Sequence, residues 1–275
     1  MNRFNSLHDL FFDKLYEISE YGSEIHSNGS TQTELLFQSF VLNDPTRLSI
    51  DFPSRKFNEN YSVMEFLWYL SQNKRTNNIG KHAGIWLKIK DNQDEVESNY
   101  GTYILGEQWD WIKSEFNRDI DSRRCTIVIH QPHHKTKNKQ DLPCTQYLQF
   151  FIRNNELHLG VNMRSNDVIF GLCNDVYTFA LFQQLMLNDL REIYPDLELG
   201  SYYHYAGSLH LYEAHYDMRD KIYHDNVDAS TKSSILHRHI TTDYIIDNKL
   251  YMPVDDMTKD EILTFTKETA KKLFI

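Results

Sequence analysis

The feature that most constrains the fold is a pair of short apolar segments followed closely by a long one. Residues 146–152 and 157–163 are separated by Asn154-Asn155, and the second segment has apolar side chains at every second position. This period of two is typical of a strand, and the asparagine pair between the segments indicates a hairpin. Residues 176–190 are mostly apolar, which predicts a helix buried on more than one side. A helix packed against a sheet places the chain in the α+β class.

Other segments extend this unit, and none of them indicates a second domain. Helix starts are expected at Ser6, at a capping box formed by Ser62-x-x-Glu65 and at another formed by Thr258-x-x-Glu261, and strands are expected at 34–41 and 125–129. Residues 71–98 are rich in Asn, Lys, Asp and Gln, so we expect an exposed, variable connection there. Because we see neither an internal repeat nor a linker, we expect one domain over residues 1–275.

Charge and cysteine content exclude several functional classes. The net charge of −10, from 29 basic and 39 acidic residues, argues against nonspecific nucleic-acid binding, which needs clustered Lys and Arg. No apolar run approaches the roughly 20 residues of a membrane span, and the N-terminus lacks a secretory signal pattern, so we expect a cytoplasmic protein with no membrane partner. The three cysteines are an odd number without a C-x-x-C pair, so neither a disulfide framework nor a structural zinc site is expected.

One of these cysteines lies where a nucleophile would be useful. Cys144 follows Leu142-Pro143 and precedes a predicted strand, so it is expected to be more exposed than a cysteine inside an apolar run. It becomes a nucleophile only if positive charge lowers its pKa; otherwise it simply packs. We interpret Cys125, which opens a strand, and Cys173, which precedes a helix, as structural.

Two basic motifs lie next to predicted strands. Arg123-Arg124 precedes one strand, and Arg164-Ser165 follows another. Guanidinium groups and a serine hydroxyl suit a phosphate group, although arginines also commonly pair with surface carboxylates.

The histidine clusters carry less information. His130, His133 and His134 lack a carboxylate or cysteine partner at ligand spacing, so no metal site is expected. His237 and His239 alternate as residues in a strand do.

Taken together, these motifs resemble those of the thymidylate synthase family. They occur in the family's order, and the match is dense from about residue 99 to residue 216: Glu65-Phe66-Leu67-Trp68, Ser98-Asn99-Tyr100-Gly101, Asp121-Ser122-Arg123-Arg124, Leu142-Pro143-Cys144, Arg164-Ser165-Asn166-Asp167-Val168, Gly171-Leu172 and Gly207-Ser208-Leu209-His210-Leu211-Tyr212. The resemblance implies a mixed central sheet flanked by helices and a homodimer that packs sheet against sheet.

The resemblance also implies roles in nucleotide chemistry. Cys144 is similar to the thiolate that adds to C6 of a pyrimidine nucleotide, after which C5 attacks the one-carbon unit of 5,10-methylenetetrahydrofolate. Arg164 and Ser165 resemble phosphate ligands, and Arg123 and Arg124 resemble the pair that reaches the phosphate of the neighbouring subunit. The family's own-subunit phosphate arginine, expected near residues 28–33, has no basic counterpart here.

The remaining implied roles concern the sugar, the base and the folate. His210 and Tyr212 resemble the pair that binds the sugar hydroxyl, which leaves ribose and deoxyribose both open. The other residues with implied roles are Asn166 on the nucleotide, Asp167, Trp86 and Gly171 on the folate, Tyr100 near the C5 proton, and Glu65 in water and proton transfer. For Glu65 the capping box is an alternative role.

Asp175 distinguishes this sequence from most of that family. Thymidylate synthases have asparagine four residues after the glycine that matches Gly171, and its amide suits uracil. An ionised carboxylate only accepts hydrogen bonds, so it repels O4 of uracil and favours the N4 amino group of cytosine. Deoxycytidylate hydroxymethylases of the family have aspartate at this position. The resemblance therefore implies conversion of dCMP, or CMP, with methylenetetrahydrofolate and water to the 5-hydroxymethyl nucleotide and tetrahydrofolate.

Two alternatives remain open at this point. A thymidylate synthase-type enzyme would methylate dUMP or dCMP and release dihydrofolate, and the sequence does not say whether water or hydride completes the reaction. A non-enzymatic homologue that binds nucleotide or RNA is the other alternative, and the intact set of Cys144, Arg164 and Tyr100 argues against it.

Overall fold

The hairpin and the long helix form the centre of the molecule. In the computed structural model, which describes residues 2–27, 29–135 and 140–275, β5 (Thr145–Arg153) and β6 (Glu156–Met163) pair antiparallel. Helix α6 (Gly171–Leu190) then crosses over to β8 (Glu198–Tyr212), which pairs parallel with β6. Both the hairpin and the buried helix are confirmed.

The sheet is mixed, and the described residues contribute eight strands to it. Its main path runs β1-β3-β8-β6-β5-β4, while β2 pairs with β3 and β7 pairs with β8. The bounds of these other strands are β1 (Asn2–Phe4), β2 (Ser23–Ser27), β3 (Ser30–Leu42), β4 (Thr126–Val128) and β7 (Asn166–Asp167). The predicted α+β class, with a mixed sheet flanked by helices, is confirmed.

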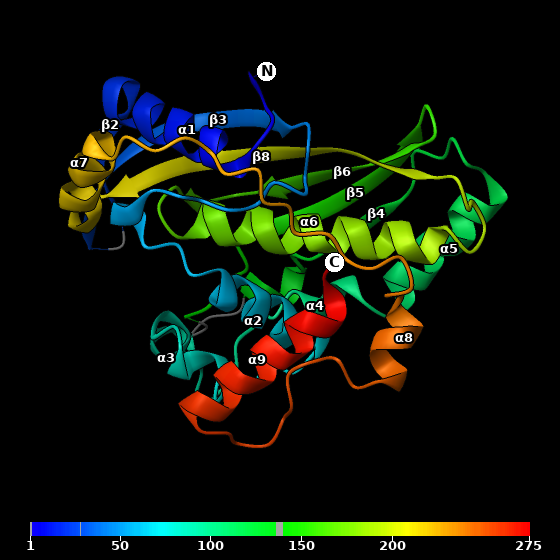
Figure 1. Ribbon diagram of the computed structural model, residues 1–275. Coiled ribbons are helices and arrows are strands. Elements are labelled where there is room, and N and C mark those ends of the chain that lie inside the picture. The colour runs from blue at the N-terminus through cyan, green and yellow to red at the C-terminus, as the bar shows by residue number, and fades with distance from the viewer. Residues whose placement is uncertain (1, 28, 136–139) are drawn as a thin grey trace.

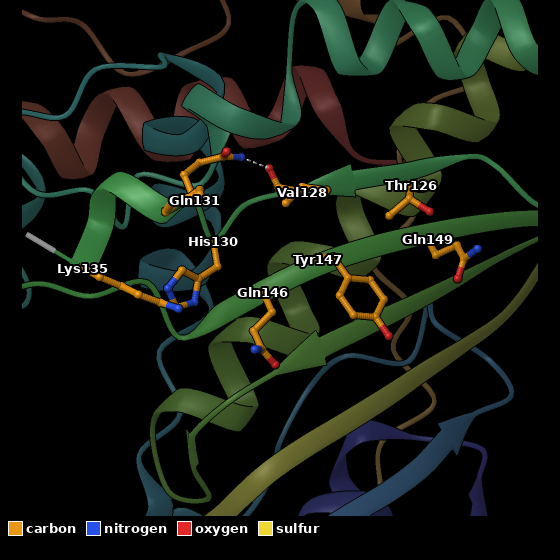
Figure 2. A pocket seen from close by; sticks show the side chains of 9 residues that line it. Thr126, Val128, His130, Gln131, Lys135, Gln146, Tyr147 and Gln149 are labelled. Carbon is orange, nitrogen blue, oxygen red and sulfur yellow. Dashed lines mark hydrogen bonds between the residues drawn. The ribbon is translucent and has the colours of Figure 1, made fainter.

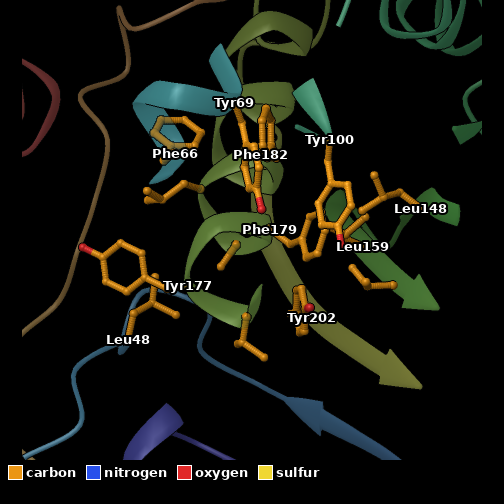
Figure 3. Close-up of a cluster of buried hydrophobic side chains, with 14 of the residues drawn as sticks. Leu48, Phe66, Tyr69, Tyr100, Leu148, Leu159, Tyr177, Phe179, Phe182 and Tyr202 are labelled. Carbon is orange, nitrogen blue, oxygen red and sulfur yellow. The ribbon is translucent and has the colours of Figure 1, made fainter. Parts of the chain in front are cut away.

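Helix α6 lies between the sheet and a further layer of helices (Figure 1). Phe179 and Phe182 of α6 pack among aromatic side chains from both layers, including Tyr69 and Tyr202 (Figure 3). The helices are α1 (Leu7–Tyr21), α2 (Glu59–Leu70), α3 (Ile85–Ile89), α4 (Gly101–Ile104), α5 (Glu107–Arg118), α7 (Tyr216–His224), α8 (Thr242–Asp247) and α9 (Lys259–Leu273). Among the described residues, no helix combines the length and apolar character that a bilayer span needs.

The opposite face of the sheet is open. Strand alternation buries Ile127 and Leu148, whereas their neighbours Val128 and Tyr147 pair with each other and are exposed. Apolar side chains therefore line a surface that no layer formed by the described residues buries at these positions.

Two expectations about local structure are wrong, and a third, the exposed segment 71–98, holds only in part. Helix α2 begins at Glu59 with Asn58 as its N-cap, and Ser62 donates instead to Asn174 Oδ1 on α6 (2.8 Å), so Glu65 takes no part in a cap. The segment 71–98 is anchored and not simply exposed, because Asn78 is buried and donates to the carbonyls of Pro253 and Asp255. His237 and His239 are not in a strand; the neighbouring Leu236 forms only an isolated bridge to Phe274. The caps at Ser6 and Thr258 are confirmed.

Candidate active site

Cys144 lies directly before β5 beside the guanidinium group of Arg164. Arg164 donates to the carbonyls of Leu142 and Pro143 (2.7 and 3.1 Å), and its NH2 atom is 3.6 Å from Cys144 Sγ. Burial raises the pKa of Cys144 to about 11, while Arg164 acts to lower it. The thiol is therefore protonated near pH 7 and lies beside a cation that stabilises the thiolate once it forms.

Tyr100 is held against the nucleophile by the segment before α4. Its hydroxyl accepts a hydrogen bond from the backbone N–H of Cys144 (3.3 Å). Asp141 accepts from both the N–H and the hydroxyl of Ser98 (2.7 Å each), which ties this segment to the cysteine loop a second time. A Cβ atom at Gly101 would lie 1.7 Å from the carbonyl oxygen of Tyr69, so only glycine lets Tyr100 approach α2 this closely.

Two carboxyl groups face this region, the half-buried Asp175 of α6 and the buried Glu65 of α2. Burial raises the pKa of Asp175 to about 7, although Asn166 Nδ2 donates to Asp175 Oδ2 (2.8 Å) and lowers it in part. Burial, and then the charge of Asp175, raise the pKa of Glu65 to about 8. Both groups exchange protons near neutral pH, which is the range that acid–base catalysis uses.

Glu65 is connected to Trp86 through a residue that the sequence analysis missed. The Tyr61 hydroxyl donates to Glu65 Oε1 (3.0 Å) and accepts from Trp86 Nε1 (2.8 Å). Tyr61 and Glu65 are four residues apart on α2, so their helical spacing was a usable signal. The segment 71–98, which carries Trp86, therefore contributes to the site.

The phosphate and sugar candidates lie on the turns around β7 and at the end of β8. Arg164 and Ser165 form the connection between β6 and β7, and the carbonyl of Arg164 accepts from the N–H of Ser208 (3.1 Å). His210 and Tyr212 meet edge to face with ring centroids 4.9 Å apart. Burial lowers the pKa of His210, so its ring is neutral at pH 7.

Asp167 and Gly171 shape the start of α6. The Asp167 carboxylate accepts from the backbone N–H groups of Ile169, Phe170 and Gly171 (3.1, 2.9 and 3.3 Å). A Cβ atom at Gly171 would lie 3.1 Å from Asn166 Nδ2 and 3.6 Å from Asp175 Oδ2. Gly171 thus leaves room for the hydrogen bond between those two side chains.

Arg123 and Arg124 are not part of this cluster. Both are exposed, and the Arg123 carbonyl accepts from the side chain of Gln149, which pairs with Thr126. Gln149 is five residues along β5 from Cys144, so the backbones of these two residues are roughly 16 Å apart, and the backbone of Arg123 lies beside Gln149. Within one protomer the two arginines therefore lie apart from Arg164.

The other cysteines and histidines lie elsewhere. Cys125 and Cys173 are buried, which confirms that they are packed side chains. His133 and His134 do have a carboxylate neighbour, Glu97, which the sequence spacing could not reveal because it is far along the chain. His134 Nδ1 accepts from the N–H of Gln131, and its Nε2 atom contacts the Tyr103 hydroxyl, so hydrogen bonds already occupy both ring nitrogens.

A pocket opens on the exposed face of the sheet. It lies over β4 and β5, where the side chain of Tyr147 projects from the sheet and Gln131 donates to the carbonyl of Val128 (2.8 Å; Figure 2). A second pocket on this face runs along β5, β6 and β8 and includes Phe151 and Tyr203. Both are continuous with the apolar surface described above.

Comparison with known proteins places these features in context. The sequence matches the family model described as thymidylate synthase over residues 9–252. It is 30% identical over 207 residues to the deoxycytidylate 5-hydroxymethyltransferase of Enterobacteria phage T6, covering 71% of this chain and 82% of that protein. It is 25% identical over 219 residues to the deoxyuridylate hydroxymethyltransferase of Bacillus phage SP01, covering 74% of this chain and 56% of that protein.

A solved structure shares the fold. The thermostable thymidylate synthase A from Bacillus subtilis superimposes with a TM-score of 0.67 at 17% identity, covering 86% of this chain and 88% of that one. At this identity the likeness concerns the fold alone.

Proposed function

The chain belongs to the thymidylate synthase family, and we propose that it is a one-carbon transferase that hydroxymethylates C5 of deoxycytidine monophosphate. The observation that carries this proposal is the half-buried carboxyl group of Asp175, which stands where thymidylate synthases have a carboxamide and accepts a hydrogen bond from Asn166 Nδ2 (2.8 Å). Cytosine presents an amino donor at position 4 and an acceptor at N3. A carboxyl group that accepts from the amine and shares a proton with N3 matches both.

The residues around Cys144 support its role as the nucleophile. The thiol proton passes to solvent as the sulfur bonds to C6 of the pyrimidine, and Arg164, 3.6 Å from the sulfur, stabilises the anionic form. The electron pair moves into the ring, where a proton shared between Asp175 and N3 offsets the charge. C5 then becomes the nucleophile. The Tyr100 hydroxyl, hydrogen-bonded to the backbone of Cys144, is our candidate for assisting the later loss of the C5 proton.

The residues also fit a flat folate. When bound, 5,10-methylenetetrahydrofolate supplies one carbon at the oxidation level of formaldehyde. Trp86 offers an indole ring whose N–H is already satisfied by Tyr61, and Asp167 offers a carboxylate at the start of α6. We propose that these residues, with Gly171 beside them, hold the folate. Glu65, with a pKa of about 8, holds a proton near neutral pH and can exchange it with the water that completes hydroxymethylation.

We further propose a homodimer that packs the open sheet faces together. Exposed Val128 and Tyr147 favour burial against a second copy, because an apolar surface of this kind marks an interface. The exposed Arg123 and Arg124, distant from their own Cys144, would then reach the phosphate bound by the partner.

Product analysis tests the proposed reaction. Purified protein is incubated with methylenetetrahydrofolate and dCMP, CMP or dUMP, and the products are identified by mass spectrometry. We expect 5-hydroxymethyl-dCMP and tetrahydrofolate, no rise in dihydrofolate absorbance, and no product from Cys144→Ser. A methylated product with dihydrofolate would instead identify a synthase, and a preference for CMP would correct the sugar assignment.

A further inference from the structure

A line of three buried polar side chains leads away from Asp175 into the core. Asn166 Nδ2 donates to Asp175 Oδ2 (2.8 Å), and Asn166 Oδ1 lies 3.1 Å from Nε2 of His204. His204 Nδ1 lies 3.0 Å from the Tyr202 hydroxyl. Tyr202 is fully buried, His204 and Asn166 are each 2% exposed, and Figure 3 shows Tyr202 on β8 within the aromatic cluster beside α6.

The hydrogen bonds in this line all point toward Asp175. The amide oxygen of Asn166 can only accept, so His204 carries its proton on Nε2. His204 Nδ1 is then an acceptor, and Tyr202 donates to it. Burial lowers the pKa of His204 to about 3, so the ring stays neutral and keeps this tautomer. The result is a directed chain that ends on one oxygen of Asp175, Oδ2.

Packing alone does not require these polar groups. The ring of His204 stacks on Phe40 with centroids 4.9 Å apart and an angle of 6°, a contact that a phenyl ring would make equally well. Tyr202 and His204 are two residues apart on β8, so both point to the same, inward face of the sheet. Burying a polar group costs free energy unless it is hydrogen-bonded. The presence of Tyr202 and His204 at these positions therefore points to a role beyond packing.

The direction of the chain matters because a protonated carboxyl group is ambiguous. With a proton on one oxygen, it offers one donor and one acceptor, as a carboxamide does. Depending on which oxygen carries the proton, it could match either cytosine or uracil. Because Asn166 Nδ2 donates to Oδ2, that oxygen remains an acceptor, and the proton of the carboxyl group lies on Oδ1.

We propose that His204 and Tyr202 are positioning residues for base selection, which act through Asn166 to keep Asp175 Oδ2 an acceptor and Oδ1 the oxygen that carries the proton. This inference rests on the proposed function, because it explains how the same site distinguishes cytosine from uracil. Neither residue touches the pyrimidine in this scheme. Their effect is on the ratio between two substrates and not on the chemistry of the nucleophile.

The test compares tritium release from 5-labelled dCMP and dUMP. His204→Phe keeps the stacked ring and removes the donor to Asn166. His204→Gln restores a donor, since its side-chain nitrogen is as many bonds from Cα as Nε2. Tyr202→Phe removes only the hydroxyl, and it provides the test if His204→Phe does not fold. Tyr194→Phe, which removes a hydroxyl bonded to the Phe116 carbonyl, is the matched control.

We expect the dCMP to dUMP ratio of kcat/KM to fall about tenfold in His204→Phe, to fall about threefold in Tyr202→Phe, and to stay near the wild-type value in His204→Gln and Tyr194→Phe. An unchanged ratio in a folded His204→Phe or Tyr202→Phe variant would overturn the inference, as would an equal loss in His204→Gln. If the wild-type protein releases tritium from neither nucleotide, the proposed function itself fails, and that result is distinct from an unchanged ratio.

Discussion

Glu65 and Asp175 keep their protons to a higher pH than exposed carboxyl groups do, and the physical cause is the same for both. Glu65 is buried and Asp175 is half-buried, and the loss of solvent penalises the charged form of each more than nearby hydrogen bonds stabilise it. Buried acids of this kind lower the stability of a folded protein when they ionise. These two perturbed carboxyl groups are therefore the ones that we propose for a chemical role.

Stability measurements can test this at Glu65. Its pKa is about 8 in the folded protein and 4.5 when unperturbed, so between these values only the folded state holds the proton and the free energy of unfolding falls as pH rises. Glu65→Gln lacks this penalty. We expect it to be more stable than wild type by roughly 2–4 kcal/mol at pH 8–9 in urea unfolding, with no difference near pH 4. A difference that does not vary with pH would contradict the assignment.

At the scale of elements, the sequence predicts those whose pattern is local. The hairpin, helix α6 and the cap at Thr258 follow from alternation, apolar length and a capping box. The start of α2 does not follow from such a pattern, because Ser62 hydrogen-bonds across the interface with α6 and does not cap its own helix. Asn78 looks like a loop residue, yet it binds carbonyls about 175 residues further along the chain, and no local pattern carries that information.

The residues of the candidate site also divide into those that a local sequence pattern reveals and those that it does not. Cys144, Arg164 and Asp175 belong to motifs and are found from the sequence. Tyr61 and His204 act through neighbours on other elements, so their contribution emerges only when Trp86 and Asn166 are placed beside them. A polar residue at an inward position of a strand, such as His204, is the signal that a closer reading would have used.

The start of α6 carries a prediction of its own. In Gly171→Ala the new Cβ would press on Asn166 Nδ2 at 3.1 Å and disturb its hydrogen bond to Asp175. We expect kcat/KM for dCMP to fall about tenfold, while alanine's better helix propensity leaves the melting temperature unchanged or slightly higher. Gly84→Ala, where nothing lies within 4 Å of the new Cβ, is the control. Full activity in Gly171→Ala would show that the hydrogen bond tolerates displacement.

For the molecule as a whole, the open sheet face and the placement of the arginines belong together. Arg123 and Arg124 are exposed beside β4 and β5, and in the dimer that we propose they would reach the partner's site. The same dimer would cover the exposed Val128 and Tyr147.

Subunit mixing tests this arrangement. Cys144→Ser and the double variant Arg123→Ala/Arg124→Ala should each be nearly inactive alone. When the two variants are mixed one to one, unfolded and refolded together, half of the dimers are hybrids, and each hybrid has one intact site out of two. About a quarter of wild-type activity should therefore return. Refolded wild type is the control for recovery. No gain of activity on mixing would show that the arginines act within their own chain.

The central claim is that the carboxyl group of Asp175 selects the base. The most direct measurement is tritium release from 5-labelled dCMP and dUMP by wild type and Asp175→Asn, in which a carboxamide restores the donor and acceptor that uracil needs. We predict that wild type prefers dCMP and that the variant prefers dUMP, a change in the ratio of kcat/KM of about a hundredfold or more. A variant that keeps the wild-type preference for dCMP would contradict the account.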